Sequence, residues 1–239
     1  MVESIVDELA ALADPKRRER IGDYYSMDVS GYLGIATPVV RRLSARQYAD
    51  LRSRPLDDVL AVCERLLKTR IYECKTVAFD WAYRRRSSVG PDHFGVYERW
   101  LRAYVDDWGD CDDFCVHALG HLVHEHPELV ARTVAWSDAP EWWVRRAAAV
   151  VLIYGLRRGS FLSDAFGAAD RLLEDRVDLV RKGYGWALKE AGKRWPDDVL
   201  DFVVERESEM PRVAFRYAIE KLPAPMRTRA MSGRPAGEP

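Results

Sequence analysis

The sequence lacks a long apolar run, has few cysteines and carries almost no net charge. No apolar stretch approaches the roughly 20 residues that a membrane-spanning helix needs, so we expect no membrane association. The four cysteines in 239 residues are too few and too scattered for a disulfide scaffold. The N-terminal segment carries acidic residues and lacks the basic start of an export signal. Together these absences predict a reduced, cytoplasmic protein.

The charge balance excludes little by itself. Lys and Arg number 37 against 38 Asp and Glu, which gives a formal net charge of −1. A nucleic-acid partner remains compatible with this value, because a basic groove can be balanced by acidic residues elsewhere. With 48% hydrophobic and 31% charged residues, the chain is predicted to be globular rather than disordered.

The sequence also lacks the alternation of apolar and polar residues that is typical of β-strands, and its apolar residues instead follow helical spacing. Apolar residues recur at steps of three or four in 55–68 and again in 71–82. Prolines such as Pro38 and Pro196 stand where helices would begin, since a proline in a first turn loses no hydrogen bond. The sequence therefore predicts an all-α protein of about a dozen helices of ~10–17 residues.

Helices of this kind, none able to bury its own face alone, favour an α-solenoid of HEAT-like helical repeats with a concave face. A compact helical bundle is the alternative. We expect residues 1–222 to form a single domain. The proline-rich end, 223–239, is expected to be a flexible C-terminal tail.

A tryptophan interrupts the polar face of the helix expected near the end of the domain. At about 100° per residue, Trp186 lies opposite the apolar stripe, flanked by Lys182 and Lys189. Gly183 and Gly185 leave backbone room beside it. The ring is either covered by lysine stems or a neighbouring repeat, or it is a stacking platform beside phosphate-binding cations.

A second unusual helix opens with the acidic segment 106–114. Asp112 lies within its apolar stripe, one turn after Trp108, so the carboxylate and the indole share a side. A helix cap is the simpler explanation for an acid here, but Asp110 and Asp113 would serve as well. Asp112 is the acid expected to point towards a solenoid's inner groove.

The segment Trp143–Leu156 is apolar nearly all round, which predicts a central buried helix. Arg145 and Arg146 stand in its first turns, where the helix dipole disfavours a cation. Some anion should compensate them. An ion pair with Asp112 or its neighbours and a contact to phosphate are both open.

Histidines at 117, 121 and 124 share a helix face at a spacing that could hold a metal. This is the polar face, away from Asp112, so we read these histidines as exposed and expect neither a metal nor a cofactor. Cys111 and Cys115 point to the apolar side and are read as core.

Basic residues stand in clusters along the chain. Cations at helix ends suit the dipole, but a subset lining one concave surface would drive DNA binding through counterion release. The clusters are Arg41–Arg42, Arg84–Arg86, Arg157–Arg158, Arg181–Lys182 and Lys193–Arg194.

Short motifs of aromatic, basic and acidic residues extend along most of the chain, and their order and spacing are fairly specific. They resemble those of the AlkD family of DNA alkylation-repair glycosylases, which are HEAT-like repeat proteins. The motifs are Tyr25, Tyr32–Ile35, Thr37–Pro38 with Arg41 and Arg42, Trp108 with Asp112, His126–Leu129, Trp143 with Arg146–Ala148, and Gly185–Lys189.

The resemblance implies roles for individual residues. Trp108 and Trp186 would flank the deoxyribose of the lesion, with Asp112 as the catalytic carboxylate. Arg146 would contact the DNA backbone, and Tyr25 would lie near the lesion. From this list and the basic clusters, the expected DNA-binding residues are Arg146, Tyr25, Lys182, Lys189, Arg41 and Arg42.

The implied activity is monofunctional excision of cationic N3- or N7-alkylated purines from double-stranded DNA, as in base excision repair. A cationic base leaves as a neutral molecule, so no general acid is needed, unlike in ordinary glycosidases. One carboxylate can stabilise the positive charge that builds up on the deoxyribose, helped by indole faces. A groove without a closed base pocket admits both methyl and bulky adducts.

Two other functions stay open at this stage. A non-catalytic DNA-binding relative would keep the basic groove and the tryptophans, with Asp112 arguing against it. A helical-repeat adaptor that binds proteins would need no tryptophan among lysines. In each case we expect a monomer.

Overall fold

The computed structural model describes residues 1–25 and 27–232, and every regular element in these ranges is helical. The predicted all-α class is therefore confirmed. No helix within the described ranges is long and apolar enough to cross a membrane.

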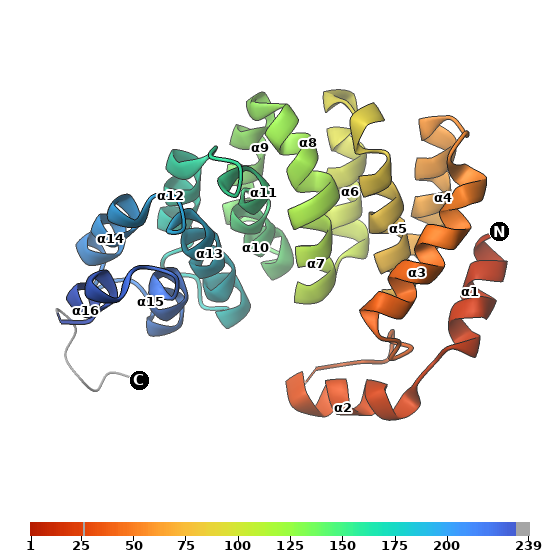
Figure 1. Cartoon of the computed structure of the whole chain (residues 1–239), viewed down its shortest axis with the longest axis horizontal. Coiled ribbons are helices and arrows are strands. Elements are labelled where there is room, and N and C mark those ends of the chain that lie inside the picture. Colours follow the sequence, from red (N-terminus) through yellow and green to blue (C-terminus); the bar gives the residue numbers. More distant parts are fainter. Residues whose placement is uncertain (26, 233–239) are drawn as a thin grey trace. The chain divides into compact units, whose positions relative to one another are not determined.

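The chain divides into two compact units, Met1–Val105 and Asp106–Pro239. That 1–222 form one domain stays a prediction. The first unit contains α1 (Val2–Ala11), α2 (Pro15–Tyr25), α3 (Thr37–Gln47), α4 (Leu56–Lys68), α5 (Tyr72–Arg84) and α6 (Phe94–Tyr104), with 3-10 turns at Tyr48–Leu51, Arg86–Ser88 and Pro91–His93 (Figure 1).

The second unit carries the candidate site. Its helices are α7 (Trp108–Phe114), a π-helical segment (Cys115–Leu119), α8 (Gly120–Glu125), α9 (Val130–Val134), α10 (Trp142–Val150), α11 (Ile153–Leu156), α12 (Leu162–Arg171), α13 (Asp178–Ala191), α14 (Pro196–Glu205), α15 (Arg212–Ile219) and α16 (Ala224–Ser232), with 3-10 turns at Pro127–Leu129 and Ala135–Asp138.

Helices of the second unit pack as pairs whose members form two layers. One layer contains α10, α13 and α15, each packed on the next. Each of these helices also packs on the one that precedes it in the other layer, which contains α9, α12 and α14 (Figure 1). A solenoid of helical repeats is built from pairs of this kind.

The strongest sequence patterns are confirmed. Helices α4 and α5 occupy the two segments whose apolar spacing predicted them. Pro38 lies in the first turn of α3, and Pro196 is the first residue of α14. The predicted apolar stripe is buried on α13 at Val180, Tyr184, Ala187, Leu188 and Ala191. Its first predicted member, Val177, precedes the helix as its N-cap and is only half-buried.

Several helices are shorter than the ~10–17 residues expected from the spacing. The predicted helix over 143–156 is buried along most of its length but breaks into α10 and α11. It breaks because the Leu152 N–H donates to the carbonyl of Ala149, three residues back rather than four. The helix after Asp112 is likewise divided by the π-helical segment, which ends just before Gly120.

The expected flexible tail is wrong for residues 224–232, which form α16. Pro225 stands in its first turn, where a proline costs no helical hydrogen bond. Arg227 anchors the helix by donating from Nη1 to the carbonyl of Leu222 (3.1 Å), and Ala230 is buried. The rest of the predicted tail, 233–239, lies outside the described residues.

Helix α13 approaches α15 closely because a glycine faces it. A Cβ on Gly185 would lie 2.8 Å from the carbonyl oxygen of Ala214 and 2.8 Å from Cβ of Tyr217. Both atoms belong to α15, and the carbonyl is backbone that cannot move aside alone. Gly167, on α12, has open space where its Cβ would be.

Gly185→Ala is expected to destabilise the protein by about 1–3 kcal/mol, because overpacking outweighs the better helix propensity of alanine. Gly167→Ala is the matched control and should stabilise by up to about 1 kcal/mol. Urea denaturation of both variants measures the difference. Equal stabilisation by the two substitutions would contradict the close approach of α13 to α15.

Candidate functional site

One guanidinium group joins three helices of the second unit. Arg146 on α10 donates from Nε to Oδ1 of Asp112 (2.8 Å) and from Nη2 to Oδ2 (2.7 Å), a two-pronged ion pair with α7. Its Nη1 also donates to the backbone carbonyl of Leu179, in the first turn of α13. The predicted compensating anion for Arg146 is therefore Asp112.

The neighbouring arginine is compensated in the same way. Arg145 donates from Nε to Oδ2 of Asp175 (2.6 Å) and from Nη1 to the carbonyls of Ala139 and Pro140. Both arginines in the first turns of α10 thus have carboxylate partners. For this pair of residues, the structure favours the ion-pair alternative over a phosphate contact.

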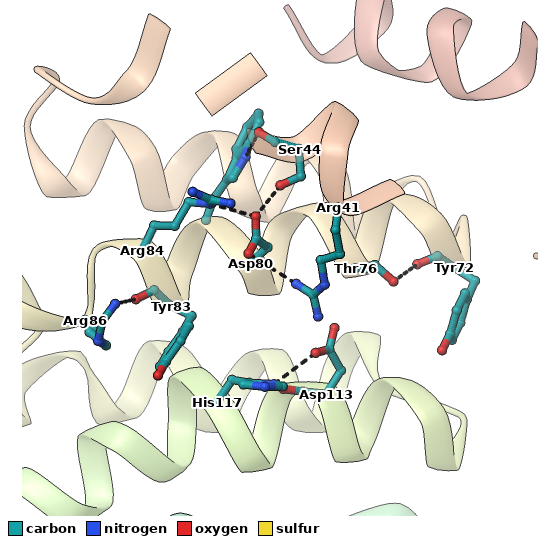
Figure 2. Close-up of polar contacts among 11 residues, drawn as sticks. Arg41, Ser44, Tyr72, Thr76, Asp80, Tyr83, Arg84, Arg86, Asp113 and His117 are labelled. Atoms are coloured by element: carbon teal, nitrogen blue, oxygen red, sulfur yellow. Dashed lines mark hydrogen bonds and ion pairs between the residues drawn. The ribbon is translucent and has the colours of Figure 1, made fainter. Parts of the chain in front are cut away.

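Asp112 does not cap its helix. Asp107 is the N-cap of α7, and its Oδ1 accepts from the N–H of Gly109 (2.6 Å). Asp110 completes a capping box by accepting from the N–H of Asp107 (3.1 Å). Asp113 pairs with Nδ1 of His117 at 3.1 Å, as Figure 2 shows. Three of the acids around Trp108, namely Asp107, Asp110 and Asp113, thus have partners within their own helical segment.

The ion pair lies largely out of solvent, with 16% of the Asp112 side chain and 6% of the Arg146 side chain exposed. Burial raises the pKa of Asp112 above its ordinary value, and the charge and hydrogen bonds of Arg146 oppose that shift. Burial alone would lower the pKa of Arg146, but the Asp112 charge outweighs it and raises that pKa. The two-pronged geometry is that of an arginine with an ionised carboxylate.

Gly183 makes room for this arginine. A Cβ at Gly183 would lie 2.9 Å from Cγ of Arg146 and 3.2 Å from its Nη1. The backbone of α13 can therefore lie directly against the arginine side chain. The sequence predicts that Gly183 and Gly185 leave space beside Trp186, whereas the structure shows that Gly183 makes room for Arg146 and Gly185 for α15.

The two tryptophans are both half-buried. Trp108 is the first residue of α7, one helical turn before Asp112. Trp186 lies on α13, and its Nε1–H donates to Oε1 of Glu190 (3.3 Å), one turn further along. Helices α7 and α13 both pack against α10, on which Arg146 lies.

Glu190 is a buried acid beside Trp186 that the sequence motifs do not single out. Its side chain is 4% exposed and accepts from Nε of Arg157 (3.0 Å) and from Nζ of Lys193 (2.7 Å), besides Trp186. Burial alone would raise the pKa of Glu190, but the hydrogen bonds from Arg157 and Lys193 hold it below its ordinary value. The spacing of Trp186 and Glu190, four residues apart on a helix, could have identified the contact.

The expected DNA-binding lysines differ in their surroundings. Lys189 pairs with Oε2 of Glu220 (3.0 Å) and lies beside the Tyr217 ring, with 17% of its side chain exposed. Lys182 is half-buried and has no hydrogen bond or ion pair with any residue that the structure describes. Of these two, Lys182 therefore has the charge that is not already neutralised.

The remaining expected contacts belong to the first unit. Figure 2 shows Asp80 of α5 between Arg41 and Arg84, with ion-pair distances of 3.3 Å to Nη1 of Arg41 and 2.8 Å to Nε of Arg84. Arg42 is exposed. Tyr25, at the end of α2, is 48% exposed and packs edge-on against Tyr24.

The three histidines do not form a metal site with other ligands. Within 1–25 and 27–232, no group of three or more His, Cys, Asp or Glu side chains could hold a metal ion. The interpretation of all three as exposed is wrong, because the rings of His121 and His124 pack against Tyr154 at centroid distances of 5.4 and 5.6 Å. Cys111 and Cys115 are fully buried, as predicted.

Arg146→Ala is expected to cost about 3–5 kcal/mol of unfolding free energy, because it leaves the Asp112 charge partly buried without its partner. Adding Asp112→Asn should recover part of that loss. Arg171→Ala, which breaks a pair with Asp138 in which both side chains are more than half exposed, should cost less than about 1 kcal/mol. Urea denaturation compares them, and a similar cost for Arg146 and Arg171 would contradict this assignment.

Comparison with known proteins gives the family. The family model described as "DNA alkylation repair enzyme" matches residues 5–222. A predicted DNA alkylation repair enzyme from Enterococcus faecalis has a similar structure, with a TM-score of 0.77, 18% sequence identity, and coverage of 89% of this chain and 97% of that one. No curated protein matches the chain.

A second solved structure, of smu.31 from Streptococcus mutans UA159, is also similar. Its TM-score is 0.56 at 18% identity, and the match covers 78% of this chain and 99% of that one. At these identities, both structures support the fold alone. The family model spans nearly the whole described chain, including both tryptophans and the Asp112–Arg146 pair, and the chain therefore belongs to the DNA alkylation repair enzyme family.

Proposed function

We propose that this protein is a DNA glycosylase of the AlkD type, which releases cationic N3- or N7-alkylated purines from double-stranded DNA. The observation that carries the proposal is Asp112, a single carboxylate that is oriented by Arg146 and retains some exposure, one helical turn from Trp108. Membership of a DNA alkylation repair family supports DNA as the partner.

The reaction requires one anionic group to stabilise positive charge, and it requires no general acid to protonate the leaving base. A purine that is alkylated at N3 or N7 is already cationic, so it departs as a neutral base while positive charge builds up on the deoxyribose. Asp112 stabilises that charge by Coulomb attraction and can orient the attacking water. The protein therefore needs no second carboxylate of the kind that protonates the leaving group in ordinary glycosidases.

Arg146 acts on the reaction through Asp112 in this proposal. Its bonds to both carboxylate oxygens and to Leu179 fix the direction in which Asp112 points. Each carboxylate oxygen still has an unused lone pair after the two bonds from Arg146 are made. The role implied for Arg146 by the resemblance, a contact to the DNA backbone, is thus replaced by the role of a positioning residue.

The indoles supply the remaining attraction. The faces of Trp108 and Trp186 would lie along the lesion's deoxyribose, and a cation–π contact contributes about 0.5–2 kcal/mol, depending on desolvation. Glu190 holds the Trp186 ring by accepting from its Nε1–H, and Cζ of Arg157 lies over the ring at 5.9 Å from its centre, so the deoxyribose would contact the opposite face.

Phosphate contacts divide into two groups in this proposal. Lys182 and Arg42 would contact the DNA backbone, and Tyr25, which is 48% exposed, would contact the lesion strand. Lys189 and Arg41 have carboxylate partners in Glu220 and Asp80, so their contribution to DNA affinity is expected to be smaller.

Asp112→Asn is expected to slow the release of 7-methylguanine from duplex DNA by on the order of 10²–10³, because the substitution removes the charge while keeping the shape. Single-turnover assays that count abasic sites measure the rate. DNA binding measured with undamaged duplex provides the control, since Asp112 faces the sugar rather than the phosphates. No release by the unmodified protein, or equal release by the variant, would rule out the catalytic proposal.

The release rate should also depend on pH. The ionised form of Asp112 is the active one, and burial raises its pKa. Protonation therefore begins at a higher pH than for an ordinary aspartate, and the rate should fall as the pH is lowered through that range. The acidic fall should be absent in Asp112→Asn, with circular dichroism at each pH confirming that both proteins stay folded. An acidic limb that persists unchanged in the variant would assign it to another group.

A further inference from the structure

Two basic pairs that are far apart in the sequence meet beside Trp186. Arg157 and Arg158 follow α11, and Lys193 and Arg194 follow α13. Arg194 donates from Nε to the backbone carbonyl of Arg157 (3.3 Å), which brings the pairs together. We call these four residues the basic cluster.

The basic cluster has more positive charge than nearby carboxylates balance. Glu190 accepts from both Arg157 and Lys193, so one acid serves two cations. Arg158 donates to the carbonyl of Tyr154 (2.9 Å) and Arg194 to that of Arg157. Among the described residues, neither of these two arginines has a carboxylate partner.

The four basic residues and Glu190 differ in their exposure to solvent. All four basic side chains belong to exposed residues, whereas the Glu190 side chain is 4% exposed. A ligand can therefore reach the cations and not the carboxylate. Four like charges held together repel one another, and a bound anion would offset that repulsion.

The backbone geometry supports this convergence. Gly159 has φ +93°, a left-handed conformation that a side chain would strain, and it ends the turn after α11. A Cβ at Gly159 would lie 3.7 Å from Nη1 of Arg194. The glycine thus allows the chain to reverse direction, and because it has no side chain, the guanidinium of Arg194 can lie close to its backbone.

A helix C-terminus attracts a cation through its dipole, so one basic pair alone would need no ligand. The convergence of two basic pairs indicates an anionic ligand, and their position in the structure indicates which anion binds there. Cζ of Arg157 lies 5.9 Å from the centre of the Trp186 ring, and both side chains bind Glu190. The cations therefore adjoin an indole that is proposed to lie against a nucleotide sugar.

We propose that the basic cluster binds backbone phosphates of duplex DNA next to the nucleotide at Trp186, with Glu190 fixing Arg157 and Lys193 relative to the indole. The place of the lesion in this arrangement rests on the proposed function, whereas binding of phosphates does not require excision. Four cations with one carboxylate among them carry more charge than a single small anion balances, whereas successive phosphates on one strand supply several negative charges.

The test is the salt dependence of binding to undamaged duplex DNA. Arg158→Gln with Arg194→Gln removes the two cations that lack a carboxylate partner. Each phosphate contact contributes about 0.9 to the slope of log affinity against log salt, so the slope should become shallower by about 2. At ~50 mM salt, the affinity should fall by on the order of 10- to 100-fold.

Arg171→Gln with Arg206→Gln is the matched control. It removes the same charge, but Arg171 pairs with Asp138 and Arg206 with Asp170. A change of slope confined to the first double variant supports the proposal. An unchanged slope there, or an equal change in both double variants, overturns it.

These outcomes are separate from those of the proposed function, because undamaged DNA is never excised. If 7-methylguanine is not released while the slope still falls in the first double variant, the catalytic proposal fails and the basic cluster stands. If release depends on Asp112 while the salt slope of the first double variant is unchanged, the catalytic proposal stands and the proposal for the basic cluster fails.

Discussion

The second unit of this protein depends on the ion pair between Asp112 and Arg146. Its two short hydrogen bonds tie α7 to α10, and the third bond of the guanidinium, to Leu179, ties both helices to the start of α13. In a pair this far from solvent, the loss of either partner would leave the other charge buried and unpaired. The same three bonds that hold the helices together determine where the carboxylate points, so stability and the proposed chemistry share one contact.

The sequence predicted the elements that local spacing determines. It predicted α4, α5 and the buried stripe of α13, because apolar residues at helical spacing mark the buried face directly. It also predicted that cations in the first turns of α10 need anions, since the helix dipole disfavours them. Which anion each arginine meets depends on how helices pack across the unit, so the sequence left Asp112 or its neighbours and a phosphate as alternatives and did not identify Asp175.

Other features could not be predicted in this way. The role of Glu190 depends on Arg157, which belongs to a different helix pair, and the space beside Gly183 is filled by an arginine from α10. The proline-rich end 223–239 is expected to be a flexible tail, although a proline in a first helical turn is tolerated and α16 forms around Pro225. The histidine face was assigned as though one uninterrupted α-helix ran from α7 through α8.

The histidine face was misassigned because of the π-helical segment Cys115–Leu119, which interrupts the α-helix. A π turn holds one more residue than an α turn, so α8 is rotated by about 100° from where an unbroken α-helix would place it. The rotation lets Gly120 meet Tyr154, a side chain against which His121 and His124 also pack. The loss of one residue in 115–119 would therefore reorient Trp108 and Asp112 as a block without altering either side chain, which makes chain length here as constrained as residue identity.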